Sequence, residues 1–246
     1  MGPFQGYGYL GWLPSIIRRS FAFKYFVRHG YKPSDLADTK IFYFPLHLEP
    51  EVALLAASPE FNNSIELVTW VSKSLPADCV IVIKEQPFAF GIRSRTYYDY
   101  FRRMPNAVLA DPRVPSWDWI KAAKVVVTIT GTAGSEAVFF ERPVLSYGKH
   151  QIINHLPSVR FAHDYESTAS QVNNLVVHPP STSVLQASKE ALSNALIDVS
   201  FTLPGFERTY DDYGPQQELA RLAIDQIKRH FPQVLAKHGD SLAHSS

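Results

Sequence analysis

The sequence is poor in cysteine and has no long apolar run. Its 246 residues contain a single cysteine, Cys79, so no disulfide can form within the chain, as is typical of proteins in a reducing compartment. No apolar run approaches the ~18 residues that a membrane-spanning helix needs. The N-terminus also lacks the charged-then-apolar order of a signal peptide. We therefore expect a cytoplasmic protein.

The sequence also has no large excess of charge of one sign and no metal-ligand cluster. The formal net charge is +1, which gives no reason to expect a nucleic-acid partner. No group of His, Cys or Asp residues has metal-ligand spacing, and we expect neither a metal nor another cofactor. The dinucleotide fingerprint, the P-loop and the nucleophile elbow are all absent. With 46% hydrophobic residues, the chain can still build a sizeable core.

A glycine turn between an apolar run and a helix is the most informative stretch. Residues 125–129 are mostly β-branched and indicate a buried parallel strand. The turn that follows contains Gly131 and the hydroxyl side chains Thr130, Thr132 and Ser135, and Glu136 opens a helix over 136–140. Such a turn can direct backbone N–H groups at an anion, and Glu136 can accept hydrogen bonds from a ribose diol. Many turns of this kind bind nothing, so both interpretations stay open.

Strands and helices alternate along most of the chain. Predicted strands cover 41–44, 79–83, 107–110, 125–129 and 143–147, and predicted helices cover 65–75, 96–103, 115–123, 136–140, 167–177, 183–197 and 214–231. This alternation predicts an α/β fold with a parallel sheet and helices on both faces. A ligand of such a sheet binds beyond the C-terminal ends of the strands.

Polar residues follow these strand ends. His47, Glu49 and Glu51 come after the first strand, Lys84, Glu85 and Gln86 after the second, Asp111 and Arg113 after the third, and the glycine turn after the fourth. Lys84 can meet a phosphate or cap the sheet edge. His47 can act as a general base or as a hydrogen-bonded loop residue. Arg93 and Arg95 can meet an anionic substrate or lie in solvent at a helix start.

The N-terminal segment is aromatic and basic. Residues 16–32 contain five positive charges and no acid. Such a segment can make a peripheral contact with an anionic membrane surface, or it can be a helix packed on the domain with its basic face in water.

Several motifs together resemble one family. They are Phe44-Pro45-Leu46-His47-x-x-Pro50-Glu51, Lys84-Glu85-x-Pro87, Thr128-Ile129-Thr130-Gly131-Thr132-Ala133-Gly134-x-Glu136-Ala137 and Pro143-Val144. In this order they resemble the capsule polysaccharide biosynthesis family of bacterial surface-glycan glycosyltransferases, which includes capsule Kdo transferases. The resemblance covers about residues 40–165.

The resemblance implies a GT-B arrangement of two Rossmann-like domains, of which this chain is similar to the C-terminal, donor-binding one. It implies that a nucleotide sugar is held by Lys84, Glu85, Gln86, Thr130, Gly131, Thr132, Ser135 and Glu136. His47 and Glu51 would face the sugar as catalytic residues. The implied organisation is an N-terminal segment (1–39), a Rossmann-like nucleotide-sugar-binding domain (40–237) and a tail (238–246).

Two departures from the family pattern keep several hypotheses open. Gln86 stands where the family usually has a histidine, and glutamine cannot become cationic. Residues 1–39 are also too few for the N-terminal acceptor domain. We therefore expect a glycosyltransferase of capsule or surface polysaccharide biosynthesis, using a donor such as CMP-Kdo and a glycan or glycolipid acceptor, or the donor-binding half of one. The alternatives are a non-catalytic nucleotide-sugar-binding or assembly module of a membrane-associated glycan complex and, third, a sugar-nucleotide epimerase.

Overall fold

The computed structural model describes residues 9–47, 58, 61 and 63–200, together with 221, 222, 224, 225, 228 and 229. Side chains are described from residue 16 onward. The chain divides into two compact units, residues 1–190 and 191–246. In the described part of the second unit, Arg221 and Asp225 form an ion pair of 3.2 Å one helical turn apart. The predicted boundary at 237 lies outside the described residues and stays a prediction.

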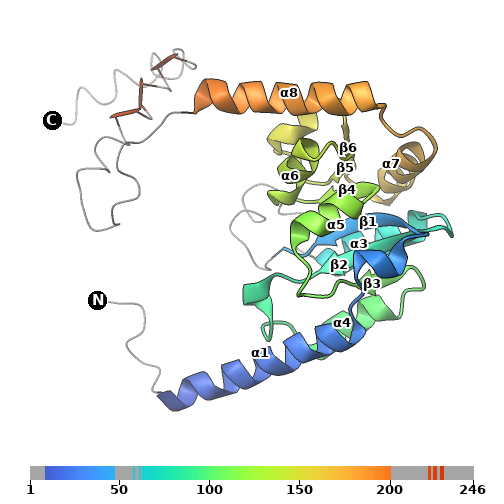
Figure 1. Cartoon of the computed structure of the whole chain (residues 1–246), viewed down its shortest axis with the longest axis vertical. Coiled ribbons are helices and arrows are strands. Elements are labelled where there is room, and N and C mark those ends of the chain that lie inside the picture. Colours follow the sequence, from blue (N-terminus) through green and yellow to red (C-terminus); the bar gives the residue numbers. More distant parts are fainter. Residues whose placement is uncertain are drawn as a thin grey trace. The chain divides into compact units, whose positions relative to one another are not determined.

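The first unit is built on a six-stranded parallel sheet (Figure 1). Its strands are β1 (Lys40–Pro45), β2 (Cys79–Lys84), β3 (Ala107–Leu109), β4 (Val125–Thr128), β5 (Val144–Ser146) and β6 (Val159–Phe161), in the spatial order β3-β2-β1-β4-β5-β6. Each neighbouring pair is parallel. Every residue of β2 and β4 is buried, as their continuous apolar sequences predict. The fold is an α/β Rossmann-like fold, and this prediction is confirmed.

The strand order reverses between β1 and β4. From β1 the chain proceeds outward through β2 and β3, then returns to place β4 against the other side of β1, with Phe42 opposite Val125. Loops that leave the C-terminal ends of β1 and β4 therefore diverge and leave a crevice between them. This is the topological switch point at which open α/β sheets bind their ligands.

Helices cover both faces of the sheet. On one face α3 (Ser64–Ser74), α4 (Arg95–Arg102) and α7 (Tyr165–Val177) contribute to a core that contains alternate strand residues such as Phe42 and Phe44. On the other face lie α5 (Ser116–Ala122) and α6 (Ala133–Phe139). Tyr43 points to the opposite face from Phe42 and Phe44. Its ring stacks on that of Trp119 in α5, with the two ring centroids 6.3 Å apart. The alternation along β1 thus supplies both cores.

The aromatic, basic N-terminal segment forms a helix, α1 (Tyr9–His29), followed by the short 3-10 helix η1 (Pro33–Leu36). Phe26 of α1 is buried against Phe90 and Tyr98, with ring centroids 5.2 and 4.7 Å apart. Of the two interpretations of residues 16–32, the structure shows the helix packed on the domain, while membrane contact stays a prediction. None of the helices in the described part of the chain has the length and apolar character needed to cross a bilayer.

The remaining elements are η3 (Pro87–Ala89), η4 (Ile152–His155) and α8 (Thr182–Val199). The strands predicted over 41–44, 79–83, 107–110, 125–129 and 143–147 are all present, and so are the predicted helices between 65 and 197. Two elements differ from expectation: β6 follows a stretch in which no strand was predicted, and α6 begins at Ala133, inside the glycine turn. Of the helix predicted over 214–231, most residues lie outside the described part.

Candidate functional site

A pocket of about 380 Å³ opens at the C-terminal ends of the central strands. It lies beside the switch point, because His47 follows β1 while Gly131 and Thr132 follow β4. Its size falls in the range of small-molecule sites in proteins. The lining residues are Tyr43, Pro45, His47, Lys84, Glu85, Gln86, Pro87, Pro112, Arg113, Val114, Pro115, Ser116, Gly131, Thr132, Ala133 and Glu136.

Most of the site residues proposed from the sequence meet in this pocket. His47, Lys84, Glu85, Gln86, Gly131, Thr132 and Glu136 line it. Thr130 belongs to the same turn and Ser135 to α6, and neither is part of the lining. Glu51 lies outside the described residues. The parallel sheet brings the others together because the loops after β1, β2 and β4 leave from one edge.

His47 is buried and takes part in the backbone structure of the glycine turn. Its Nε2 accepts a hydrogen bond of 3.2 Å from the Ile129 N–H, so the ring proton lies on Nδ1. Burial, and then the charge of Arg93, lower the pKa of His47 to about 4. The imidazole is therefore neutral at physiological pH, and the lone pair of Nε2 is already used. Of the two roles considered for His47, this geometry matches the hydrogen-bonded loop residue.

Gly131 lets the turn approach this imidazole. A Cβ at Gly131 would lie 2.8 Å from Cε1 of His47, which is too close for a stable contact. The Gly131 N–H donates to Thr128 Oγ1 at 3.2 Å, so this amide is partly used within the turn. Thr132 Oγ1 donates to Glu136 Oε1 at 3.0 Å, which fixes the Glu136 carboxylate at the pocket wall.

A second group of side chains, Glu85, Arg93 and Tyr98, forms a buried ion-pair cluster that reaches the pocket lining through Glu85. Arg93 Nη1 lies 2.7 Å from Glu85 Oε2, and their side chains are 8% and 0% exposed. The Tyr98 hydroxyl donates to the same carboxylate at 2.7 Å, and burial followed by the charge of Glu85 raises its pKa. Arg93 also donates to the main-chain carbonyl of His47. Sequence reasoning placed Arg93 in solvent or against a substrate, whereas the structure assigns it to this cluster.

Gln86 makes a second link between the loops after β1 and β2. Its Nε2 donates to the Leu46 carbonyl at 2.9 Å, and its main-chain N–H donates to Glu85 Oε1 at 2.9 Å. The glutamine side chain is therefore used within the protein. A glutamine at this position keeps the pocket wall in place without adding charge.

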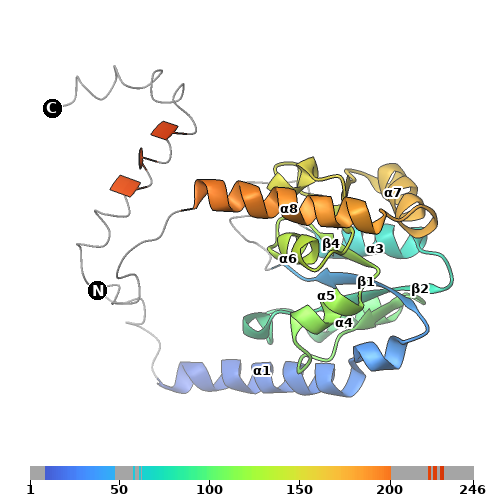
Figure 2. The same ribbon diagram turned by 45° about the horizontal axis from the view of Figure 1, so that its top comes forward.

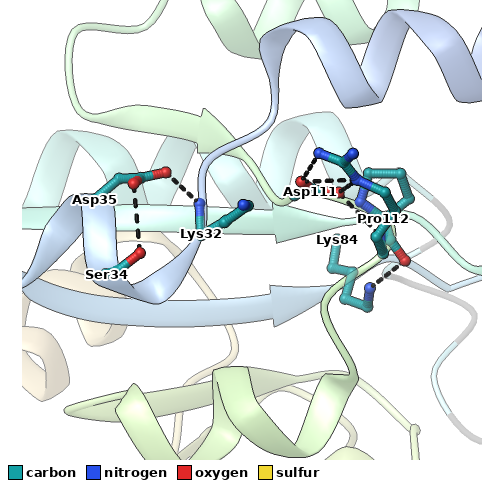
Figure 3. Close-up of polar contacts among 7 residues, drawn as sticks. Lys32, Ser34, Asp35, Lys84, Asp111 and Pro112 are labelled. Carbon is teal, nitrogen blue, oxygen red and sulfur yellow. Dashed lines mark hydrogen bonds and ion pairs between the residues drawn. The ribbon is translucent and has the colours of Figure 1, made fainter.

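Lys84 supplies a cation at the end of β2. Its side chain is buried, and Nζ donates to the Val114 carbonyl at 2.8 Å and to the Pro112 carbonyl at 3.5 Å (Figure 3 shows the latter bond). Burial lowers the pKa of Lys84, while the nearby Asp111 carboxylate opposes this effect. Arg113 Nη2 lies 2.6 Å from Asp111 Oδ2, and this hydrogen bond lowers the pKa of Asp111. The pocket wall thus combines a buried ammonium group with the more exposed guanidinium of Arg113.

Two polar lining residues, Tyr43 and Ser116, escaped sequence reasoning. Tyr43 reads as a core strand residue, and burial is the main reason that its pKa is raised, with a smaller contribution from Glu136. Ser116 opens α5 and Arg113 follows β3, a position already noted as part of the ligand-binding edge. The described residues contain no group of three or more His, Cys, Asp or Glu side chains placed to hold a metal ion.

Of the comparisons with known proteins, only the one with solved structures found similar proteins. No protein-family model matches the chain. No curated protein matches it either. KpsC from Thermosulfurimonas dismutans, a beta Kdo 2,7 transferase, is 17% identical over 68% of this chain and 53% of its own length, with a TM-score of 0.42.

Two further solved structures show the same level of similarity. Anabaena HepE in complex with UDP-glucose is 12% identical over 71% of this chain and 48% of its own length, with a TM-score of 0.49. MnaA from S. aureus, solved with UDP, is 13% identical over 68% of this chain and 46% of its own length, with a TM-score of 0.45. The chain spans about half the length of these structures. At such identities and TM-scores the likeness does not assign a function to this chain.

Proposed function

We propose that the chain is a glycosyltransferase, or the donor-binding half of one, in capsule or surface polysaccharide biosynthesis. The donor is a nucleotide-activated sugar such as CMP-Kdo. The observation that supports nucleotide binding best is the position of the polar pocket at the switch point of the sheet. The motif resemblance over about residues 40–165 supports the choice of sugar-nucleotide chemistry and of the capsule pathway.

In this proposal the phosphates of the donor lie against the end of β2 and the glycine turn. Lys84 has three ammonium donors, of which two are directed at the Val114 and Pro112 carbonyls, so one remains for a phosphate. Arg113 adds a second cation. The turn residues Thr130, Gly131, Thr132 and Ser135 are proposed to add further donors, of which Gly131 and Thr132 line the pocket. These groups would stabilise the charge that builds on the leaving phosphate as the bond to the anomeric carbon breaks.

The nucleoside and the sugar would occupy the rest of the pocket. Glu136, whose carboxylate accepts a hydrogen bond from Thr132, would accept hydrogen bonds from a ribose diol. His47 would act as an N–H donor through Nδ1, because its Nε2 is engaged and its pKa is low. Glu51 is proposed to face the sugar. Glu85 would act indirectly, by fixing the pocket wall through Arg93.

The proposed acceptor is a glycan or glycolipid, and the proposed location is the cytoplasm, at the inner face of the membrane. Residues 16–32 are proposed to make the peripheral membrane contact. No nucleic-acid partner is proposed.

A non-catalytic, donor-binding or assembly module is the second candidate, and one observation favours it. Among the described pocket residues, the Glu85 carboxylate is held by Arg93 and Tyr98, and His47 Nε2 is held by Ile129. Neither is placed to remove a proton from an acceptor. Incubation with a labelled sugar nucleotide and acceptor separates the candidates, since a transferase forms product and a binding module does not. A sugar-nucleotide epimerase would change the donor without any acceptor.

Calorimetric titration of CMP and UDP into the chain tests the binding site itself. We expect Lys84→Met and Glu136→Gln each to weaken nucleotide affinity by at least about tenfold, because each removes a charged hydrogen-bonding group worth about 1.5–3 kcal/mol. The variants Lys73→Met and Glu66→Gln on α3 make the same chemical changes at exposed positions outside the pocket.

These controls should bind like the wild type. Unchanged nucleotide affinity in both pocket variants would refute the assignment of this pocket. Circular dichroism of each variant separates lost binding from lost folding.

A further inference from the structure

Helices α1 and α4 form a surface that the nucleotide pocket does not use. The two helices lie side by side in both views (Figures 1 and 2). The Tyr25 hydroxyl donates to Asp99 of α4, and the guanidinium carbons of Arg95 and Arg102 lie 5.2 and 5.7 Å from the centroid of the Tyr25 ring. We define the basic-aromatic surface by its members on the two helices: Ile17, Arg18, Phe21, Lys24, Tyr25, Arg28, Arg95 and Arg102.

The packing of α1 fixes which side chains this surface presents. Phe26 points inward to Phe90 and Tyr98, so the opposite side of the helix faces outward. Ile17, Phe21, Lys24 and Arg28 follow one another at intervals of four, three and four residues, which places them in one row along that outer side. All four are exposed, and the large Phe21 ring is 69% exposed. Apolar and cationic side chains therefore share one row.

Positive charge is concentrated on this surface although the chain as a whole is nearly neutral. The sequence of α1 contains Arg18, Arg19, Lys24 and Arg28 but no Asp or Glu. Arg95 and Arg102 of α4 extend the positive charge beyond Tyr25. The carboxylate between them, Asp99, lies 3.5 Å from Arg95 and 3.4 Å from Arg102.

A groove of about 320 Å³ runs between α1 and the start of α4. Arg18, Phe21, Ala22 and Tyr25 line it from α1, and its other lining residues, Arg95 and Tyr98 among them, lie between Gly91 and Tyr98. Apolar walls flanked by arginines suit a molecule with an anionic head and an apolar body. Interfacial helices bind bilayers with this combination, since basic side chains meet lipid phosphates and aromatic side chains enter the boundary region.

We propose that the basic-aromatic surface docks on the anionic face of a phospholipid bilayer. Charge complementarity selects this partner: the five cationic side chains of the basic-aromatic surface flank exposed apolar ones, and the described residues of α1 and α4 contain one carboxylate, which is ion-paired. The exposed row containing Ile17 and Phe21 beside the cations suits the boundary region of a bilayer. This docking rests on the peripheral membrane contact proposed above for residues 16–32 and extends it to α4, whereas the role of the pocket in nucleotide binding is independent of it.

Sedimentation with vesicles tests the proposal. We expect the wild-type chain to sediment with vesicles of phosphatidylcholine and phosphatidylglycerol, to remain in solution with phosphatidylcholine alone, and to be released by added salt. Arg18→Glu/Arg28→Glu should lose most of the vesicle-bound fraction. Lys73→Glu/Lys121→Glu, on α3 and α5, changes the net charge equally and should retain it. Phe21→Ser should weaken binding at unchanged charge, because it removes the exposed ring.

Equal sedimentation of both double variants would overturn the proposal, and so would a wild-type chain that binds duplex RNA but not anionic vesicles. The nucleotide affinity of Arg18→Glu/Arg28→Glu should match that of the wild type. Loss of vesicle binding with normal nucleotide affinity therefore reports on docking, whereas the reverse result reports on the pocket.

Discussion

His47 lies where its charged form is disfavoured. The folded protein holds its pKa at about 4, below the usual 6.5, chiefly through burial. Between these values the unfolded chain binds a proton that the folded chain does not, so the free energy of unfolding falls as the pH falls from about 6.5 to about 4. The full effect is on the order of 3 kcal/mol, and about 2 kcal/mol of it should appear between pH 7 and pH 5.

The variant His47→Gln tests this interpretation, because glutamine can still accept the Ile129 hydrogen bond but cannot take up a proton. Urea unfolding at pH 7 and pH 5 should show the wild type losing about 2 kcal/mol more than the variant on acidification. His155→Gln, at an exposed position, should behave like the wild type. Parallel losses in the wild type and His47→Gln would mean that His47 is not held neutral.

At the residue scale, the sequence predicted where polar side chains gather but not what each one contacts. The positions of Lys84 and Glu136 follow from strand ends and a helix start, which periodicity makes visible. The pairing of Arg93 with Glu85 depends on how the loop after β2 folds back, and its contact with the His47 carbonyl spans 46 residues of sequence. Neither leaves a pattern in the order of amino acids.

At the scale of elements, Arg93 joins three of them. It connects the loop after β1 to the end of β2 and lies just before α4. We expect Arg93→Met to lower the free energy of unfolding by about 3–5 kcal/mol, because it leaves the Glu85 carboxylate buried without its cation. Chemical denaturation at pH 7 measures this loss.

Arg95→Met provides the matched control, since it removes the same group two residues away. The Arg95 side chain is 73% exposed, so its pair with Asp99 should contribute no more than about 0.5 kcal/mol. In addition, Glu85→Gln/Arg93→Met should cost less than the sum of the single variants, because the double variant leaves no unpaired charge. Equal effects of Arg93→Met and Arg95→Met, or additive single variants, would contradict a buried ion pair.

The elements themselves were largely predictable. β1, β2 and β4 are continuous apolar runs, and their burial on both faces leaves that pattern in the sequence. β6 was missed because it is three residues long, carries a charged Arg160 and forms at the edge of the sheet by pairing with β5. α6 begins earlier than predicted because its first turn is made of small residues, including Gly134, that have no helical pattern of their own.

At the scale of the whole molecule, the order of the strands creates the candidate site. The sequence predicts a parallel sheet and therefore an edge where ligands bind, but not which strands are neighbours. Placing β4 beside β1 brings the glycine turn next to His47, a contact across 82 residues. Lys84 and Arg113 join from β2 and the segment after β3, so the pocket is completed by tertiary structure alone.

The most direct test of the central proposal is a thermal-shift measurement of the purified chain with CMP, UDP, GDP and CDP. A nucleotide at about 100 times its Kd adds about 2.7 kcal/mol to the stability of the folded state. We expect one of these nucleotides to raise the Tm by several degrees. Glu136→Gln should reduce the rise to about half or less, because tenfold weaker binding leaves only about 1.4 kcal/mol of stabilisation. No rise with any of them, or an undiminished rise in Glu136→Gln, would contradict a nucleotide site in this pocket.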